Sequence, residues 1–301
     1  MNLHGWLVVW KQPGIVCTRI DRRVKRWLGC SVKVGHAGTL DPFAEGILPI
    51  AFGWGTRMIP FLLDFPKMYQ FTCVWGRATD TQDLTGTIIR ESSVRPSYEA
   101  VAQVLPKFLG VSFQKPCMYS AVKINGKPAY TWARKGKILD LPPRPIVIHT
   151  ARLITEASAY DGHSIEIEIL CSSGTYVRAF AGDLAEALGT LAYVSKLTRV
   201  SVGPFSSTEA VNVDTVTELC PQDAQQWMYP MDYGLKFPEI DLTQEQTVRL
   251  WNGLPLYLDL PFFSEFWVCK YQKKMICLAK GEAYGLVPYR CFVDSRVKKQ
   301  T

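Results

Sequence analysis

The sequence lacks the cysteine pairs that mark disulfide frameworks and zinc sites. Its nine cysteines are odd in number, and no two of them have Cys-x-x-Cys spacing. This distribution indicates neither a set of structural disulfides nor a tetrahedral metal centre. We therefore expect reduced thiols, as in proteins of the cytoplasm.

Long hydrophobic runs are also missing. The apolar run from Trp6 to Trp10 is far shorter than the roughly 20 residues of a membrane-spanning helix, and too short for a signal peptide. The stretch from Gly53 to Arg57 lacks the GxxxxGK[ST] spacing of a phosphate-binding loop. We expect no membrane segment, no nucleotide-triphosphate site and a cytoplasmic location.

The composition is that of a folded protein with a moderately basic charge. Hydrophobic residues make up 48% of the 301 residues, enough for a core in one large domain plus a small one, or in two domains. Residues 1–60 contain eight Lys or Arg against three acids, and residues 115–145 contain seven against one. These local excesses of five and six positive charges favour a polyanionic partner, although a solvated basic face would also explain them.

The most informative stretch is GHAGTLDPFAEGILPI, which begins at Gly35. Gly35 and Gly38 allow backbone conformations that other residues resist, and Pro42 restrains Asp41 to an extended conformation. Such a loop can hold one carboxylate at the mouth of a cleft, with His36 close by in the sequence. The alternative is an ordinary Asp-Pro turn without chemistry.

This stretch resembles the GHAGTLDPxAxGxLxI signature of the TruB family of pseudouridine synthases, which isomerise a uridine in the T arm of tRNA. Further segments are similar to the family's GxxTDTxDxxG loop, its P-x-M-[YF]-S-A-x-K segment, its SKGTY[IV]R turn and its closing P-M-D element. They lie at residues 76–86, 116–136, 172–178 and 228–232. The resemblance covers most of residues 5–236 and is loose beyond them.

The resemblance implies an α+β fold with a mixed, mainly antiparallel sheet flanked by helices and loops. It implies a catalytic domain at residues 1–236, with a thumb-like insertion at about 119–145 that closes over the T loop. A small PUA-like RNA-binding β domain would follow at 237–301. The expected partner is the T arm of tRNA, without a cofactor, a metal, a membrane or a partner protein, and the expected state is a monomer.

Local patterns predict several elements. Residues 5–10 form a buried strand, and a helix begins at a capping box of Thr18 and Asp21 and ends near Gly29. A second helix covers about 97–105. Residues 165–170 alternate as a strand whose glutamates should face water.

The resemblance also assigns catalytic roles. Asp41 would be the nucleophile, and Arg178 would keep it ionised against the effect of burial on its pKa. Tyr69 would stack on the uracil and take or relay a proton, Tyr176 would complete the pocket, and Leu197 would form its apolar wall. Ordinary core packing is the alternative for the last three residues. Attack at C1′, attack at C6 and a glycal route all stay open.

Other residues are expected to contact RNA. The mixture of charge and aromatic rings after residue 115 suits a looped RNA, although snorkelling lysines would also explain it. The remaining predicted substrate contacts are His36, which would stack where the flipped nucleotide has left, and Lys11, Lys123 and Arg134. Asp80 and Asp83 should mainly cap backbone amides. Ser173 and Thr198 replace basic residues of the family near the expected RNA surface.

Two other classes of function compete with this interpretation. An RNA-binding chaperone for tRNA folding would use the same basic segments without needing catalysis. A carboxylate-dependent glycoside hydrolase would need a second acid, and no motif here supplies one.

Overall fold

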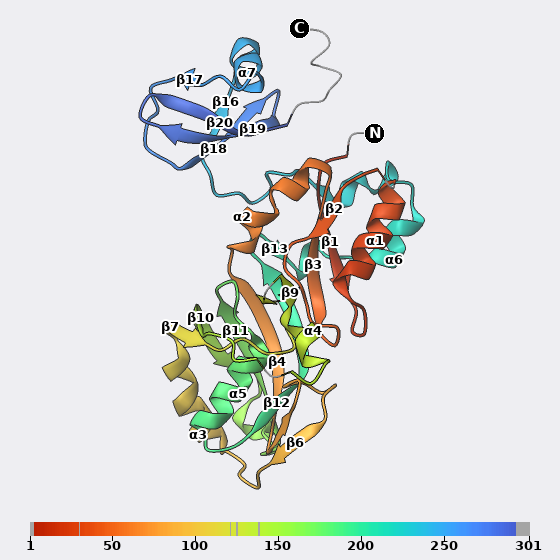
Figure 1. The fold of residues 1–301 in the computed structure, drawn as a ribbon, viewed down its shortest axis with the longest axis vertical. Coiled ribbons are helices and arrows are strands. Elements are labelled where there is room, and N and C mark those ends of the chain that lie inside the picture. Colours follow the sequence, from red (N-terminus) through yellow and green to blue (C-terminus); the bar gives the residue numbers. More distant parts are fainter. Residues whose placement is uncertain (1–2, 30, 121, 125, 138, 293–301) are drawn as a thin grey trace.

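The computed structural model describes residues 3–29, 31–120, 122–124, 126–137 and 139–292 (Figure 1). Within these residues, a large mixed sheet runs through the longer part of the molecule, and a smaller five-stranded sheet follows near the C-terminus. No helix among the described residues is long and apolar enough to cross a membrane.

The large sheet contains eleven strands among the described residues. Its main path runs in the order β14 (Val211–Asn212), β1 (Gly5–Lys11), β3 (Glu45–Phe52), β12 (Ala192–Val202), β4 (Lys67–Trp75), β11 (Ser164–Cys171), β10 (Arg144–Leu153) and β7 (Gly110–Gln114). Beside this path lie β2 (Val34–His36), β13 (Phe205–Ser206) and β15 (Met228–Tyr229). Strand β1 pairs in parallel with β14 and β12 pairs in parallel with β3, while the other pairs are antiparallel. The predicted mixed, mainly antiparallel sheet is confirmed.

Strand β1 shows why its sequence is apolar without alternation. Leu7 and Val9 belong to one hydrophobic cluster, and Trp6 and Val8 belong to another. Because successive side chains of a strand point to opposite faces, these clusters cover both faces of the sheet. The predicted buried strand is confirmed, and its neighbour β3 carries the chain out of the loop that contains Asp41.

Seven α-helices are present in the described residues: α1 (Cys17–Leu28), α2 (Ile59–Leu63), α3 (Tyr98–Val104), α4 (Ala129–Ala133), α5 (Val177–Ala187), α6 (Val213–Glu218) and α7 (Gln244–Trp251). Short 3₁₀ turns are η1 (Gly53–Arg57), η2 (Leu105–Phe108), η3 (Ala157–Ala159), η4 (Ser207–Glu209) and η5 (Asp223–Trp227). Apolar residues of α1, α3 and α5 enter the first cluster, so these helices cover one face of the sheet. The predicted helix over about 97–105 is confirmed as α3, and its N-cap is Ser97, whose side chain accepts a hydrogen bond from the Ala100 amide.

The start of α1 corrects the predicted capping box. The N-cap is Val16, which makes no side-chain cap, so Thr18 lies inside the first turn. The carboxylate of Asp21 is bonded to His36 instead of a backbone amide. The predicted end of the helix at Gly29 is confirmed, because this residue has φ 96° and its N–H donates to the Arg26 carbonyl.

Strand β11 forms as predicted, but the prediction that its glutamates face water is wrong for Glu168. This side chain is buried and accepts hydrogen bonds from Arg152 Nε at 2.6 Å and Gln70 Nε2 at 2.9 Å. Its strand lies between β4 and β10, and polar side chains from both neighbours cover the carboxylate. Alternation predicts which face of the strand carries Glu168, but the neighbouring strands decide whether that face is exposed to water.

The predicted insertion enters and leaves the sheet at one place. Strand β7 ends at Gln114 and β10 begins at Arg144, and these two residues are register partners. Between them lie α4 and a small hairpin of β8 (Lys123–Ile124) and β9 (Lys127–Pro128). A second small hairpin, β5 (Arg77–Thr79) with β6 (Ile88–Glu91), follows β4.

The C-terminal sheet runs in the order β16 (Glu239–Asp241), β18 (Phe266–Tyr271), β19 (Lys274–Glu282), β20 (Gly285–Cys291) and β17 (Leu256–Tyr257). It has its own hydrophobic cluster and lies at one end of the molecule, near α2 (Figure 1). The ring of Phe61 in α2 packs against Phe237 and Phe266. The predicted fold class, a mixed α+β domain followed by a small β domain, is confirmed.

Candidate active site

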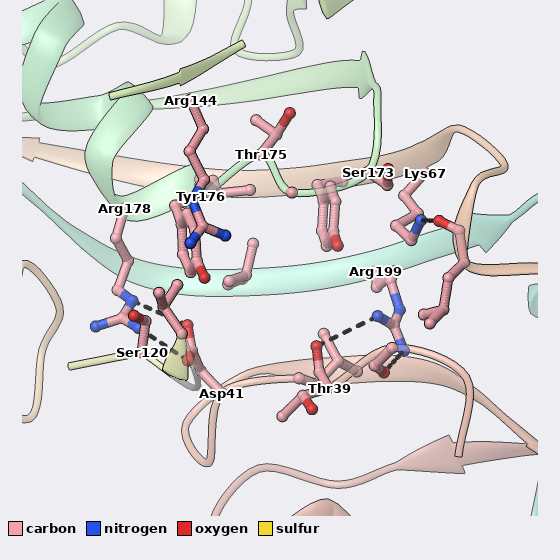
Figure 2. Close-up of a pocket in the computed structure, with 18 of the residues that line it drawn as sticks. Thr39, Asp41, Lys67, Ser120, Arg144, Ser173, Thr175, Tyr176, Arg178 and Arg199 are labelled. Carbon is pink, nitrogen blue, oxygen red and sulfur yellow. Dashed lines mark hydrogen bonds and ion pairs between the residues drawn. The ribbon is translucent and has the colours of Figure 1, made fainter. Parts of the chain in front are cut away.

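A pocket of about 530 Å³ opens where the loop after β2, strands β4 and β12, the start of α5 and the insertion meet (Figure 2). Six of the predicted site residues line it: Asp41, Tyr69, Lys123, Tyr176, Leu197 and Arg178. The predicted contacts His36, Lys11 and Arg134 are outside this lining. The pocket therefore unites the expected catalytic residues from five separate segments.

The loop that carries Asp41 is held by short backbone hydrogen bonds. Gly14 N donates to the Pro42 carbonyl at 2.8 Å, and Ala44 N donates to the Asp41 carbonyl at 3.1 Å. Gly38 has φ 89°, and its carbonyl accepts a hydrogen bond from Arg199 Nη2 at 3.0 Å. A side chain at position 38 would be strained and would crowd Arg199.

Asp41 and Arg178 form a two-point ion pair at the wall of the pocket (Figure 2). Arg178 Nη2 donates to Asp41 Oδ1 at 2.9 Å, and Nε lies 2.9 Å from Oδ2. The same guanidinium donates to the carbonyls of Tyr119 and Thr81, and its Nη1 lies 3.3 Å from Asp83 Oδ2. Nη1 and Nη2 make hydrogen bonds, whereas the buried Nε is held near Oδ2 by charge without a hydrogen bond. A guanidinium restrained in this way is pre-organised to keep one carboxylate in place.

Burial and charge act in opposite directions on this pair. Burial raises the pKa of Asp41 above its ordinary value, and the charge and hydrogen bond of Arg178 oppose that rise. The Asp83 carboxylate raises the pKa of Asp41 further. Burial lowers the pKa of Arg178, but the nearby carboxylates outweigh burial and the pKa is raised overall. The guanidinium therefore stays charged and favours the ionised form of Asp41.

The sequence predicted that Asp83 would mainly cap backbone amides, but in the structure it also faces Arg178. Its Oδ1 accepts from the Thr85 amide at 2.9 Å, while its Oδ2 faces Arg178, and the side chain is buried. Asp80 fits the simpler prediction, since its Oδ1 accepts from the Thr87 amide at 2.8 Å. Asp83 thus belongs to the shell that positions Arg178.

Arg199 is a pocket residue that the sequence reasoning missed. Its side chain is 1% exposed, and its Nε donates to the Ile47 carbonyl at 3.0 Å. Burial raises the pKa of Tyr69, and the charge of Arg199 opposes that rise. The alternation of β12 could have indicated it, because Leu197 and Arg199 are two residues apart and both line the pocket.

The same alternation leaves Thr198, between these two residues, outside the pocket lining. This residue is buried, and its hydroxyl donates to Glu45 Oε1 at 3.0 Å. Thr198 itself is therefore not an exposed surface residue, and a weaker contact with RNA where it replaces a basic residue stays a prediction. Ser173, the other replaced position, does line the pocket.

Two further cationic residues line the pocket without having been singled out. Lys67 donates to the carbonyls of Leu63 and Phe65, and burial lowers its pKa to about 8. Arg144 begins β10 at the root of the insertion and is exposed (Figure 2). Together with the exposed Lys123, it makes the pocket mouth basic.

His36 and Arg134 have other neighbours in this structure. His36 Nδ1 lies 2.7 Å from Asp21 Oδ2, and its Nε2 lies 3.3 Å from Thr39 Oγ1. Arg134 is exposed on the insertion, with its guanidinium 5.2 Å from the centroid of the Tyr130 ring. Asp21 fixes the plane of the histidine ring, and Arg134 stays accessible to a partner.

Lys11 was predicted to contact the substrate, but in the structure it is buried below the Asp41 loop. Its side chain is fully buried, and its ammonium donates to the carbonyls of Gln12, Pro42 and Ala44. Burial lowers its pKa below the ordinary lysine value. Since two of these carbonyls follow Asp41 directly in the chain, Lys11 braces the C-terminal side of the Asp41 loop, and it is not among the pocket residues.

Replacing Lys11 with methionine is expected to lower the free energy of unfolding by about 2 kcal/mol or more, since buried carbonyls lose a charged donor. The rate of catalysis should fall as well, because the Asp41 loop loses its brace. Urea unfolding measures the first effect, and Lys25→Met on the exposed face of α1 is the matched control. Equal stability of the two variants would contradict the bracing role.

No group of three or more His, Cys, Asp or Glu side chains in the described part of the chain is arranged to hold a metal ion. The chemistry of the pocket is that of a carboxylate, three arginines, two lysines and two tyrosines. Such a set can deliver a nucleophile, hold negative charge and stack a flat ring.

Comparisons with known proteins agree with the sequence motifs. A family model described as TruB family pseudouridylate synthase (N terminal domain) matches residues 25–177. A protein named tRNA pseudouridine synthase B from Bradyrhizobium diazoefficiens is 36% identical, over 97% of this chain and 86% of the relative. A protein of the same name from Paracoccus denitrificans is 34% identical, over 97% of each chain.

Two solved structures resemble the fold. A chain from an H/ACA RNP bound to a substrate RNA containing 2′-deoxyuridine has a TM-score of 0.73 and 17% identity, covering 96% of this chain and 85% of that chain. A chain from a Cbf5-Nop10-Gar1 complex has a TM-score of 0.73 and 19% identity, covering 97% and 86%. At these identities the similarity establishes the fold alone.

Proposed function

The chain belongs to the TruB family of pseudouridylate synthases, and from this premise we propose that it converts the uridine at position 55, in the T loop of tRNA, to pseudouridine with Asp41 as the nucleophile. The observation that carries the proposal is the two-point pair of Asp41 with Arg178 inside a basic pocket. Relatives that share 34–36% of the sequence over nearly the whole chain are named for tRNA as their substrate.

The size and lining of the pocket support a flipped nucleotide as the ligand. Its volume of about 530 Å³ lies within the usual range for small-molecule sites, and Lys123 and Arg144 stand at its mouth. A base must leave the stack to reach a carboxylate at this depth. Tyr69 and Leu197 supply an aromatic and an apolar wall for the uracil, and the two exposed cations pair with flanking phosphates.

The reaction rearranges bonds without a change of oxidation state. A carboxylate oxygen of Asp41 adds to the nucleotide, the N1–C1′ bond breaks, and the uracil turns within the pocket. A C5–C1′ bond then forms, the carboxylate is released, and the proton on C5 is transferred to N1 through solvent or Tyr69. Attack at C1′ and attack at C6 both satisfy this balance. In the glycal route Asp41 instead takes the C2′ proton as the N1–C1′ bond breaks, and returns it to C2′ when C5 bonds to C1′. In each route Arg178 keeps Asp41 ionised until it reacts.

We assign residues 1–236 to the catalytic unit and 237–301 to a small PUA-like domain that binds RNA. The insertion at about 119–145 lies between β7 and β10, and it closes over the T loop with Lys123 and Arg134 as phosphate contacts. The protein acts as a monomer without a partner protein or cofactor.

Replacing His36 with alanine is expected to slow the reaction by roughly 10- to 100-fold, because a stacked ring offsets about 1–3 kcal/mol of the cost of base flipping. Single-turnover rates on an unmodified tRNA transcript measure the loss. Asp21→Asn is the companion variant, since it keeps the His36 ring but weakens the bond that orients it. An unchanged rate for His36→Ala would remove the stacking role.

The proposed function is tested by incubating the purified protein with an unmodified tRNA transcript and no added cofactor. Carbodiimide treatment and primer extension then locate pseudouridine, and a single stop at the T-loop uridine is expected. A stop elsewhere would refute the site specificity. Tight, salt-sensitive binding without any stop would favour the chaperone function, and release of free uracil would indicate hydrolysis.

A further inference from the structure

Gln114 lies where the insertion leaves the sheet, outside the pocket, and makes a two-point contact with a pocket residue. Its side chain is 3% exposed at the end of β7. The Tyr176 N–H donates to Gln114 Oε1 at 2.8 Å, and Gln114 Nε2 donates to the Tyr176 carbonyl at 3.1 Å. Since one partner is a donor and the other an acceptor, a carboxamide in a single orientation satisfies both.

The backbone of Tyr176 needs such a partner. Tyr176 is the N-cap of α5, with φ −100° and ψ 109°, and makes no side-chain cap of its own. The helix uses its carbonyl, which accepts from Phe180 N at 3.0 Å, but the helix has no acceptor for its N–H. Gln114 therefore pairs with Tyr176 as a neighbouring strand would.

The position of this contact links two parts of the site. Gln114 is the register partner of Arg144, so it stands at the root of the insertion. Tyr176 lines the pocket together with Arg144 and Asp41 (Figure 2). The segment that follows Gln114 also reaches the pocket wall, because the Tyr119 carbonyl accepts from Arg178 Nη2 at 2.9 Å.

We propose that Gln114 is a positioning residue that fixes the backbone, and so the ring, of Tyr176 against the flipped nucleotide, and thereby ties the root of the insertion to the catalytic pocket. The inference rests on the proposed function, because it assigns Gln114 a part in the same reaction. Gln114 does not touch the substrate and acts through Tyr176.

The test uses three variants of the full chain. Gln114→Met removes both hydrogen bonds at similar volume. Gln114→Glu keeps the acceptor, and it regains a donor only when its carboxyl is protonated. Gln70→Met is the matched control, because it makes the same chemical change on β4, at a side chain that donates to Glu168.

Activity is measured as single-turnover release of tritium from C5 of uridine-labelled tRNA, and tRNA affinity is measured separately. Gln114→Met is expected to be about tenfold slower, with a dissociation constant within about twofold of wild type, as for a misplaced pocket group. Gln114→Glu should recover relative to wild type as the pH falls. Gln70→Met should keep the wild-type rate.

A double-mutant cycle separates positioning from a general structural role. In a Tyr176→Ala background, Gln114→Met should slow the remaining activity less than about twofold, because the ring that it positions is gone. The same tenfold loss in both backgrounds would overturn the inference, and so would a pH profile of Gln114→Glu parallel to that of wild type.

Amide hydrogen exchange tests the contact without relying on catalysis. Exchange at Tyr176 should accelerate at least about tenfold in Gln114→Met and stay near wild type in Gln70→Met. Wild-type protein that makes no pseudouridine would refute the proposed function. Unchanged amide exchange at Tyr176 in Gln114→Met would refute the two-point contact of Gln114 with Tyr176, whether or not the protein makes pseudouridine. Active protein with an additive cycle would refute the positioning role alone.

Discussion

Replacing Asp41 with asparagine is expected to reduce pseudouridine formation by about 10⁴-fold or more, the scale seen when a nucleophile is removed. The amide has nearly the same shape, and its oxygen can still accept from Arg178 Nη2, which donates to Oδ1 at 2.9 Å in the native site. It cannot attack a sugar or a base as a carboxylate does. Affinity for tRNA should stay within a few-fold, because phosphate contacts depend on other residues.

Tritium release under single-turnover conditions measures this loss, with mass spectrometry to verify that the asparagine has not hydrolysed back to aspartate. Asp80→Asn is the matched control, since it makes the same change at an exposed carboxylate that caps the Thr87 amide. That control should retain its rate. Substantial turnover by pure Asp41→Asn protein would exclude Asp41 as the nucleophile.

Replacing Arg178 with methionine is expected to cost about 10³-fold in rate, comparable to removing one pre-organised charged donor from an active site. Burial raises the pKa of Asp41, and Arg178 is the main group that lowers it. Without the guanidinium the carboxyl binds its proton more tightly. The reactive carboxylate is then lost at a higher pH than in wild type.

The loss of Arg178 should also shift the pH dependence of activity in a defined direction. Activity requires ionised Asp41, so in wild type it falls as the pH drops through a pKa that lies above the ordinary aspartate value. In Arg178→Met this acid limb should move to higher pH. Arg178→Lys keeps the charge without the two-point geometry, so its limb should lie between the two.

Folding must be checked for the methionine variant. Removing the buried guanidinium costs up to about 3–5 kcal/mol, because the buried Asp83 and the partly exposed Asp41 lose their shared cation. The lysine variant keeps the prediction testable if the methionine variant unfolds. Arg152→Met, at an exposed arginine paired with Glu168, is the control. An acid limb for Arg178→Met that coincides with wild type would contradict the electrostatic role, and a wild-type limb for Arg178→Lys would contradict the need for the two-point geometry.

The sequence by itself determined the fold class and the core of the site. Runs of apolar residues predicted the buried strand β1, and glycine and proline around Asp41 predicted a loop that presents a carboxylate. The family motifs then identified Tyr69, Tyr176, Arg178 and Leu197, all of which the structure brings to one pocket. The apolar runs, the turn residues and the family motifs are all contiguous stretches of sequence, so they can be recognised without knowing the tertiary structure.

The tertiary structure alone decided what each polar side chain contacts. Lys11 and Glu168 look like exposed charges in the sequence, yet both are buried because neighbouring segments cover them. Asp41 and Arg178 are 137 positions apart, and Gln114 and Tyr176 are 62 apart. The burial of a side chain and its partner depend on which distant strand lies beside it. That information arises only when the folded chain brings these distant segments together.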